Sequence, residues 1–121
     1  MATVIGITTV PFEGEQLKKY VDIIGDAVTE GLGLPPTMKS VTIHQLPPEA
    51  STPKPYGLIT FFVYSAPNKP LDAKREMIRR VQEATDWFFG GPGKVRTVII
   101  IKEHTDENVG VAGVLRADAK R

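Results

Sequence analysis

The sequence predicts an α/β (α+β) fold in which two tandem βαβ units form one four-stranded sheet, with two helices on one face and a C-terminal hairpin. The first observation is that residues 71–101 change from apolar positions three and four apart to a β-branched run after a glycine-rich stop. The second is a weaker copy of this pattern 57 residues upstream, where residues 20–27 match 77–84 and residues 41–43 match 98–100. A repeated helix-then-strand pattern therefore organises the chain.

The first unit begins with a β-branched segment at residues 3–9, which predicts a strand that Pro11 closes. From Glu13 onward the apolar residues follow a helical period, and Gly33 with the next two prolines ends the helix. Residues 40–44 predict the second strand, parallel to the first because a helix-length crossover joins them. The apolar face of this helix is expected to contain Leu17, Tyr20, Val21, Ile24 and Val28.

A proline-rich segment follows, because residues 46–56 carry four of the ten prolines. It predicts an extended connector that cannot be a central strand. Residues 57–65 predict the third strand, residues 71–89 the second helix and residues 95–101 the fourth strand. The buried face of the second helix is expected to contain Met77, Ile78, Val81, Ala84, Trp87 and Phe88.

Beyond Glu103, small and β-branched residues around Gly110 and Gly113 predict a short hairpin followed by a frayed tail. The whole chain is expected to form a single domain over residues 1–121. Its two repeats are predicted at residues 2–46 and 58–115, joined by the connector at 47–57.

Composition excludes several classes of function. Fifteen basic and fourteen acidic residues give a net charge of +1, without the charge asymmetry of a protein that binds nucleic acid or a membrane surface. The apolar runs are far shorter than the roughly 20 residues that span a bilayer, and no targeting signal is visible. The lack of cysteine excludes disulfides and thiol chemistry. Because nothing in the sequence indicates secretion, a cytoplasmic protein is the default expectation.

The strands themselves predict an oligomer. Residues 59–64 are apolar at both odd and even positions, and residues 98–101 form an unbroken apolar run. Both faces of the sheet should therefore carry apolar side chains, while two helices cover one face. Another subunit is the simplest cover for the second face, which predicts a homo-oligomer.

Side-chain motifs give little sign of a catalytic site. The stretch that ends in Gly93-Lys94 is not a phosphate loop, because Val95 replaces the metal-binding hydroxyl and the segment runs from helix to strand. His44 and His104 lack the spacing of a metal site, so no metal is expected. These features alone indicate a soluble α/β oligomer of unknown function.

A family resemblance adds to this interpretation. The pattern K-x-x-x-[IL]-x-x-x-x-E-A at Lys74, Ile78, Glu83 and Ala84, a Gly-Pro turn, then VRTVIIIKE and NVGVAGV, resembles the 4-oxalocrotonate tautomerase family of the tautomerase superfamily. The resemblance covers residues 59–115 well and residues 2–46 more loosely. It implies a fused two-unit tautomerase whose homotrimer would imitate a hexamer of single units.

The resemblance also implies a function: cofactor-independent keto-enol tautomerisation of a small 2-hydroxy-dienoate or 2-oxo acid. Family members use an amino-terminal proline as general base, and Ala2 stands at that position in this chain. A primary α-amine has a reference pKa of about 7.7–8.0, close to what a general base needs. The amine of Ala2, or of Met1 where Met1 is retained, is therefore the candidate base.

The resemblance further implies cationic side chains that bind the substrate's carboxylate. The family's basic position after the first strand of a unit falls on Phe12 in the first unit and on Lys69 in the second. The basic position at the second strand falls near Lys39 and Arg96, and a planar guanidinium suits a carboxylate better. Phe12 or Val109 would supply an apolar wall.

Two hypotheses remain open. The first is the tautomerase just described. The second is a non-catalytic oligomeric scaffold or partner subunit, because Ala2 and Phe12 replace both signature groups of the first unit. Hydration or dehalogenation is expected less than tautomerisation, because residues 108–114 contain neither an acid nor a tyrosine.

Overall fold

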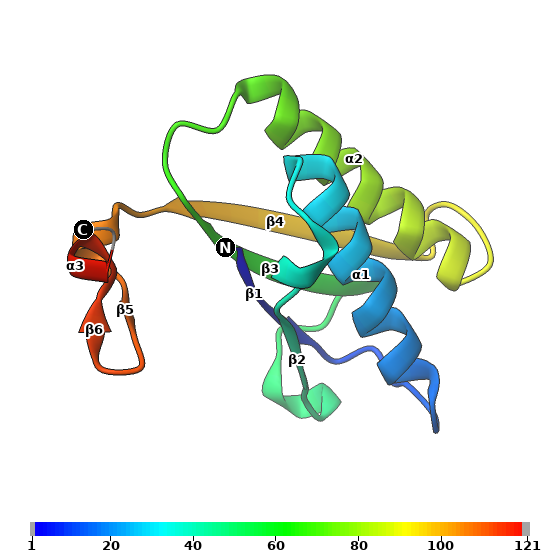
Figure 1. Ribbon diagram of the computed structural model, residues 1–121. Coiled ribbons are helices and arrows are strands. Elements are labelled where there is room, and N and C mark those ends of the chain that lie inside the picture. The colour runs from blue at the N-terminus through cyan, green and yellow to red at the C-terminus, as the bar shows by residue number, and fades with distance from the viewer. Residues whose placement is uncertain (1, 120–121) are drawn as a thin grey trace.

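In the computed structural model, which describes residues 2–119, four strands form one sheet and two long helices pack across one of its faces (Figure 1). This arrangement confirms the predicted fold class. The sheet contains β1 (Thr3–Thr8), β2 (Val41–Gln45), β3 (Gly57–Ser65) and β4 (Val95–Glu103), and the long helices are α1 (Gln16–Leu32) and α2 (Leu71–Phe88). The smaller elements are the 3-10 turns η1 (Pro36–Met38), η2 (Pro48–Ala50) and η3 (Asp106–Asn108), the strands β5 (Gly110–Val111) and β6 (Val114–Leu115), and the helix α3 (Arg116–Ala119).

The two βαβ units meet through an antiparallel pair at the centre of the sheet. The strand order is β2-β1-β3-β4, with β1 parallel to β2, β3 parallel to β4 and β1 antiparallel to β3. Thr3 pairs with Tyr64 and Thr8 with Ile59, so the start of β1 lies beside the end of β3. We call this side of the sheet the Ala2 end. The opposite side, where β3 and β4 begin, is the connector end.

The predicted offset of 57 residues is wrong by one in the last strand. Val4 pairs with Val41, a separation of 41 − 4 = 37, whereas Phe61 pairs with Ile99, a separation of 99 − 61 = 38. Ile99, and not Val98, is therefore the structural counterpart of Val41. Because side chains alternate along a strand, this one-residue difference puts Val98 on the helix-free face, where it is 43% exposed.

The core lies between the sheet and the helices. It contains Ala2, Val4, Tyr20, Ile24, Ala27, Val28, Leu32, Ile59, Phe61, Val63, Met77, Val81 and Val95. The predicted face of the second helix is wrong for Ile78 and Trp87, which are 43% and 77% exposed. The buried residues of α2 are Met77, Val81 and Thr85, four apart, and each step along a helix turns about 100°. Ile78 and Trp87 therefore point away from the sheet.

A buried hydrogen-bond chain joins the two helices. The Thr85 hydroxyl donates to the carbonyl of Val81 at 2.8 Å, so the Tyr20 hydroxyl, 2.8 Å from Thr85 Oγ1, is the donor in that pair. Burial raises the pKa of Tyr20 well above its usual value, and the hydrogen bond to Thr85 offsets only part of that effect. The folded protein therefore holds Tyr20 as the neutral phenol.

This burial predicts a loss of stability at high pH. Unfolding frees the phenol to ionise near the ordinary tyrosine pKa of about 10, so the free energy of unfolding should fall as pH rises above that value. The contribution of Tyr20 should reach about 1.4 kcal/mol per pH unit. Tyr20→Phe should remove this part of the slope, and should cost about 1 kcal/mol at pH 7 through the lost hydrogen bond. Urea denaturation from pH 8 to pH 11 measures both effects. An equal dependence of the free energy of unfolding on pH in the two proteins would contradict the assignment.

The C-terminal segment forms the predicted hairpin and extends away from the sheet beyond β4 (Figure 1). Ala112 and Gly113 have φ values of 52° and 84°, which suit the tight turn between β5 and β6. The predicted frayed tail is wrong for Arg116–Ala119, which forms α3. The hairpin leaves Val111, Val114 and Leu115 between 41% and 47% exposed.

The helix-free face of the sheet is apolar, as the alternation of the strands predicts. Among residues 2–119 no α-helix or strand covers it, and only the connector between β2 and β3 reaches over its edge, at Ile7 and Leu58. Ile7 and Ile100 are 38% and 42% exposed on this face. We call it the open face, and its apolar residues are Ile5, Ile7, Leu58, Phe62, Tyr64, Val98 and Ile100.

Candidate functional site

The predicted base stands at the start of the central strand pair. Ala2 immediately precedes β1 and is 1% exposed, within the core. The backbone is held two residues further along, because the amide of Val4 donates to the carbonyl of Ser40 at 2.8 Å. Met1, the other predicted catalytic residue, lies outside the described residues.

Lys69 lies at the Ala2 end of the same chain. It belongs to the turn between β3 and α2, where Asn68 adopts a φ of 66°. The backbone amide of Lys69 donates to Glu103 Oε2 at 3.4 Å, and the same oxygen lies 3.4 Å from Lys74 Nζ. The Lys69 ammonium itself forms no ion pair or hydrogen bond with the described residues. It is therefore a cation available to an anionic ligand.

Lys39 also lies at the Ala2 end, but its charge is engaged elsewhere. Its ammonium pairs with Asp22 at 3.2 Å and with Asp26. The hydrogen bond to Asp26, followed by that to Asp22, raises the pKa of Lys39. Its aliphatic stem packs over Gly25, so the side chain follows α1. A substrate carboxylate would have to compete with two protein carboxylates for this lysine.

Arg96 and Phe12 lie at the connector end, away from Ala2 of their own chain. Arg96 pairs with Leu58 in the sheet, six residues along β3 from Tyr64, which corresponds to about 20 Å. Phe12 packs into an aromatic cluster with Tyr20, Phe88 and Phe89, at centroid distances of 5.3–6.1 Å. Only a neighbouring copy of the chain could bring Arg96 or Phe12 to Ala2.

Val109 lies at the base of the hairpin, beyond the end of β4. Its carbonyl accepts a hydrogen bond from the amide of Arg116 at 2.7 Å, which closes the hairpin. The neighbouring carboxylate of Asp106 lies 3.5 Å from Arg116 Nε. Val109 is thus positioned by the hairpin and not by the sheet.

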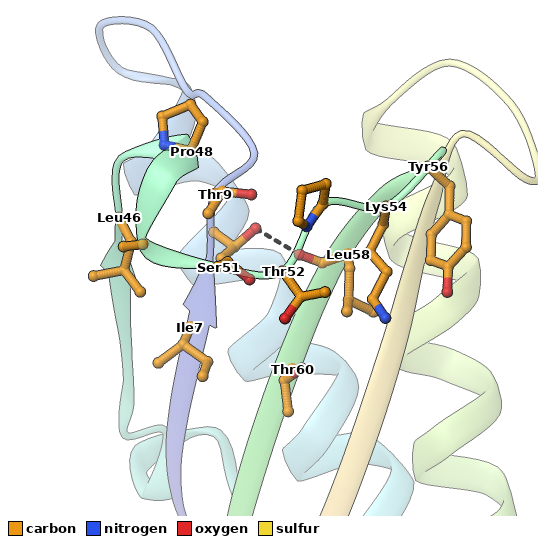
Figure 2. A pocket seen from close by; sticks show the side chains of 13 residues that line it. Ile7, Thr9, Leu46, Pro48, Ser51, Thr52, Lys54, Tyr56, Leu58 and Thr60 are labelled. Atoms are coloured by element: carbon orange, nitrogen blue, oxygen red, sulfur yellow. Dashed lines mark hydrogen bonds between the residues drawn. The ribbon is translucent and has the colours of Figure 1, made fainter.

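Sequence reasoning missed a pocket at the connector end, because it treated the connector as an extended link. The amide of Leu46 donates to the carbonyl of Thr8 at 2.8 Å, and the Thr8 hydroxyl donates to the carbonyl of Leu58 at 2.7 Å. The connector turns through η2 and folds back over the sheet, leaving a cavity of about 360 Å³ (Figure 2). This connector pocket is lined by Ile7, Thr8, Thr9, Leu46, Pro48, Ala50, Ser51, Thr52, Pro53, Lys54, Tyr56, Leu58 and Thr60. The available signal was the polar residues Ser51, Thr52 and Lys54, which alternate with prolines in the connector.

Among residues 2–119, no group of three or more histidine, cysteine, aspartate or glutamate side chains is arranged to hold a metal ion. In the same part of the chain, the helices are too short or too polar to cross a membrane.

Comparison with known proteins identifies the fold. No protein-family model matches the chain, and no curated protein sequence matches it. A crystal structure of native fused 4-OT (4-oxalocrotonate tautomerase) superposes with a TM-score of 0.83 at 16% identity, covering 98% of this chain and 99% of that one. A fused 4-OT described as an asymmetric trimer has a TM-score of 0.83 at 17% identity, with the same coverage. A malonate semialdehyde decarboxylase, described with decarboxylase and hydratase activities, has a TM-score of 0.77 at 17% identity and 98% coverage of each chain.

These likenesses extend over nearly the whole chain and over both βαβ units. The chain therefore has the tautomerase-superfamily fold, in the fused arrangement of two units.

Proposed function

We propose that the protein is a cofactor-independent keto-enol tautomerase of small 2-hydroxy-dienoates or 2-oxo acids, with the amine of Ala2 as general base after removal of Met1. The observation that carries the proposal is the full-length likeness to fused 4-OT, together with the position of Ala2 before the central strand. The Ala2 residue is 1% exposed, and an α-amine held beside this buried group would favour its neutral, basic form.

The proposed reaction moves one proton and leaves the atoms of the substrate otherwise unchanged. The neutral amine takes the proton of the 2-hydroxyl group while the electrons of the O–H bond form the carbonyl. The resulting ammonium returns a proton to a carbon of the diene, giving the 2-oxo acid.

The substrate's carboxylate needs a cation close to this amine. Lys69 of the same chain supplies one, because its ammonium has no partner among the described residues. Arg96 would contribute from a neighbouring copy, with Phe12 or Val109 as apolar wall. Lys39 is the weaker candidate because Asp22 and Asp26 already hold it.

We also propose a homotrimer, which the site requires if Arg96 takes part. The apolar open face supplies an interface, since exposed apolar surface of this kind marks association. Sedimentation should give a single species of about 40 kDa, three times the chain mass of 13.2 kDa. A monodisperse monomer at micromolar concentration would contradict the assembly.

The alternative function is a non-catalytic scaffold or partner subunit, favoured by alanine at position 2. Incubation of a 2-hydroxydienoate or phenylenolpyruvate with protein lacking Met1 tests the enzyme proposal by ultraviolet absorbance. No acceleration over buffer would contradict it. In that case Ala2→Pro distinguishes a pocket that lacks only its base from a non-catalytic scaffold. The first would gain tautomerase activity with this substitution, and the second would stay inactive.

A further inference from the structure

The turn that carries Lys69 is fixed from two sides. Pro70 follows Lys69 directly, and a residue before proline is restricted to extended backbone. From the end of β4, Glu103 Oε2 accepts a hydrogen bond from the Lys69 amide at 3.4 Å. Asn68 has a φ of 66°, a conformation that persists only where the surrounding contacts hold it. The contact with Glu103 therefore helps to set the backbone from which the Lys69 side chain projects.

Lys74 neutralises the carboxylate that makes this contact. Lys74 Nζ lies 3.4 Å from the same oxygen of Glu103, and the two side chains are only 25% and 32% exposed. Without Lys74, the Glu103 carboxylate would lie beside the Lys69 turn without a cation of its own. It would then compete with an anionic ligand for the ammonium of Lys69, because opposite charges attract more strongly where water is partly excluded.

Glu103 also lies at the same end of the sheet as Ala2. Thr3 of β1 pairs with Tyr64 of β3. The next residue of β3 is Ser65, which pairs with Glu103 of β4. Ala2, the residue before Thr3, is therefore two strands away from Glu103, or about 10 Å between backbones at the usual strand spacing. The group that holds Lys69 thus belongs to the surroundings of the proposed base.

The first unit of the chain lacks all three of these charges. Their counterparts lie 57 residues upstream for the two lysines (69 − 12, 74 − 17) and 58 upstream for the glutamate (103 − 45), and they are uncharged: Phe12, Leu17 and Gln45. The three charged residues are therefore present together in one unit and absent together from the other. This joint replacement indicates that they act as one group.

We propose that Glu103 and Lys74 are positioning residues, which act through Lys69 on the binding of the substrate's carboxylate. This inference rests on the proposed carboxylate-binding role of Lys69. Glu103 holds the Lys69 backbone in place, and Lys74 neutralises Glu103 so that the Lys69 ammonium stays available to the ligand. Neither positioning side chain needs to touch the substrate.

Titration of the ¹⁵N-labelled full chain with 3-phenylpropanoate tests this role by binding alone, because this carboxylate has no enol or 2-oxo group to react. The amide signals of Ala66, Asn68 and Lys69 give the dissociation constant. Lys69→Gln should weaken binding about tenfold, and Lys74→Met about fivefold because the unpaired Glu103 competes for the Lys69 ammonium. Adding Glu103→Gln to Lys74→Met should bring binding back within about twofold of the parent. Glutamine still accepts from the Lys69 amide but carries no competing charge.

Two controls separate positioning from general structural damage. In the Lys69→Gln protein, the further change Lys74→Met should alter binding by less than about twofold, since the group through which Lys74 acts is gone. Arg75→Met breaks the exposed pair between Arg75 and Asp72 on the same turn of α2. It should leave binding within about twofold of the parent, because an exposed pair of this kind contributes little.

Four results would overturn the positioning role. They are a parent protein whose signals at residues 66–69 do not respond to 3-phenylpropanoate, full-strength binding by Lys74→Met, no recovery on adding Glu103→Gln, and equal weakening by Lys74→Met with and without Lys69→Gln. Coupled binding without turnover of phenylenolpyruvate would support the positioning role and contradict the proposed catalysis. Turnover without the coupling would do the reverse.

Discussion

Protein that lacks Met1 should tautomerise phenylenolpyruvate about a hundredfold faster than protein that retains it. A positioned general base contributes typically about 10²–10⁴-fold, and a retained methionine would turn the Ala2 amine into an amide that cannot accept a proton. The comparison uses two preparations of one chain, with mass spectrometry to establish the amino terminus of each. Rates are read from the loss of enol absorbance under identical conditions.

The pH dependence separates this amine from other bases. In the preparation without Met1, kcat/KM should rise with pH as the amine loses its proton, and acetylation of the amino terminus should abolish that rise. Lys69→Gln serves as the matched control, because it removes a carboxylate-binding charge and should act mainly through KM. Equal rates with and without Met1 would exclude the Ala2 amine as the base.

Gly31→Ala should destabilise the protein by about 3 kcal/mol or more, the upper end of the usual cost of overpacking. At Gly31, α1 packs directly against the backbone of α2 at Met77, with no side chain between them. An added Cβ would lie 2.4 Å from Met77 Cα, 2.8 Å from its Cβ and 2.9 Å from its backbone nitrogen. Backbone atoms cannot rotate aside, so the two helices would have to separate and the buried pair Tyr20–Thr85 would stretch. Chemical denaturation measures the loss.

Gly25→Ala is the control for that experiment, since it places the same methyl group on the same helix. Its nearest neighbour would be Lys39 Cδ at 3.1 Å, part of a flexible side chain that can move. Within a helix, alanine is also more stabilising than glycine by about 1 kcal/mol. The free energy of unfolding of this variant should therefore stay within about 1 kcal/mol of the parent's. A similar loss in both variants would indicate that the Gly31 contact is not the cause.

Local sequence patterns predicted an element correctly where the spacing of its apolar side chains alone decides whether it is a helix or a strand. The predicted strand at residues 57–65 coincides with β3, and the predicted second helix ends within one residue of α2. Glycine with a positive φ ends α1, as the position of Gly33 indicates. Trp87 shows the limit of such patterns, because an apolar residue at a helical spacing is buried only when that side of the helix meets the sheet.

The candidate site was predictable only in part. The family resemblance proposes Ala2 and Lys69 as site residues, and the antiparallel pairing of β1 with β3 puts them at one end of the sheet. That pairing joins segments far apart along the chain, so no local signal specifies it. It also separates Arg96 and Phe12 from Ala2 within one chain, which sequence matching alone does not reveal.

By itself the sequence determined the helices, the strands and the repeat, because each depends on the conformational preferences and polarity of neighbouring residues. Only the tertiary structure decided the one-residue register of β4, the engagement of Lys39 by two carboxylates and the cavity beneath the connector. These features arise from contacts between distant segments. Their geometry depends on how the sheet, helices and connector pack together, which the local sequence does not encode.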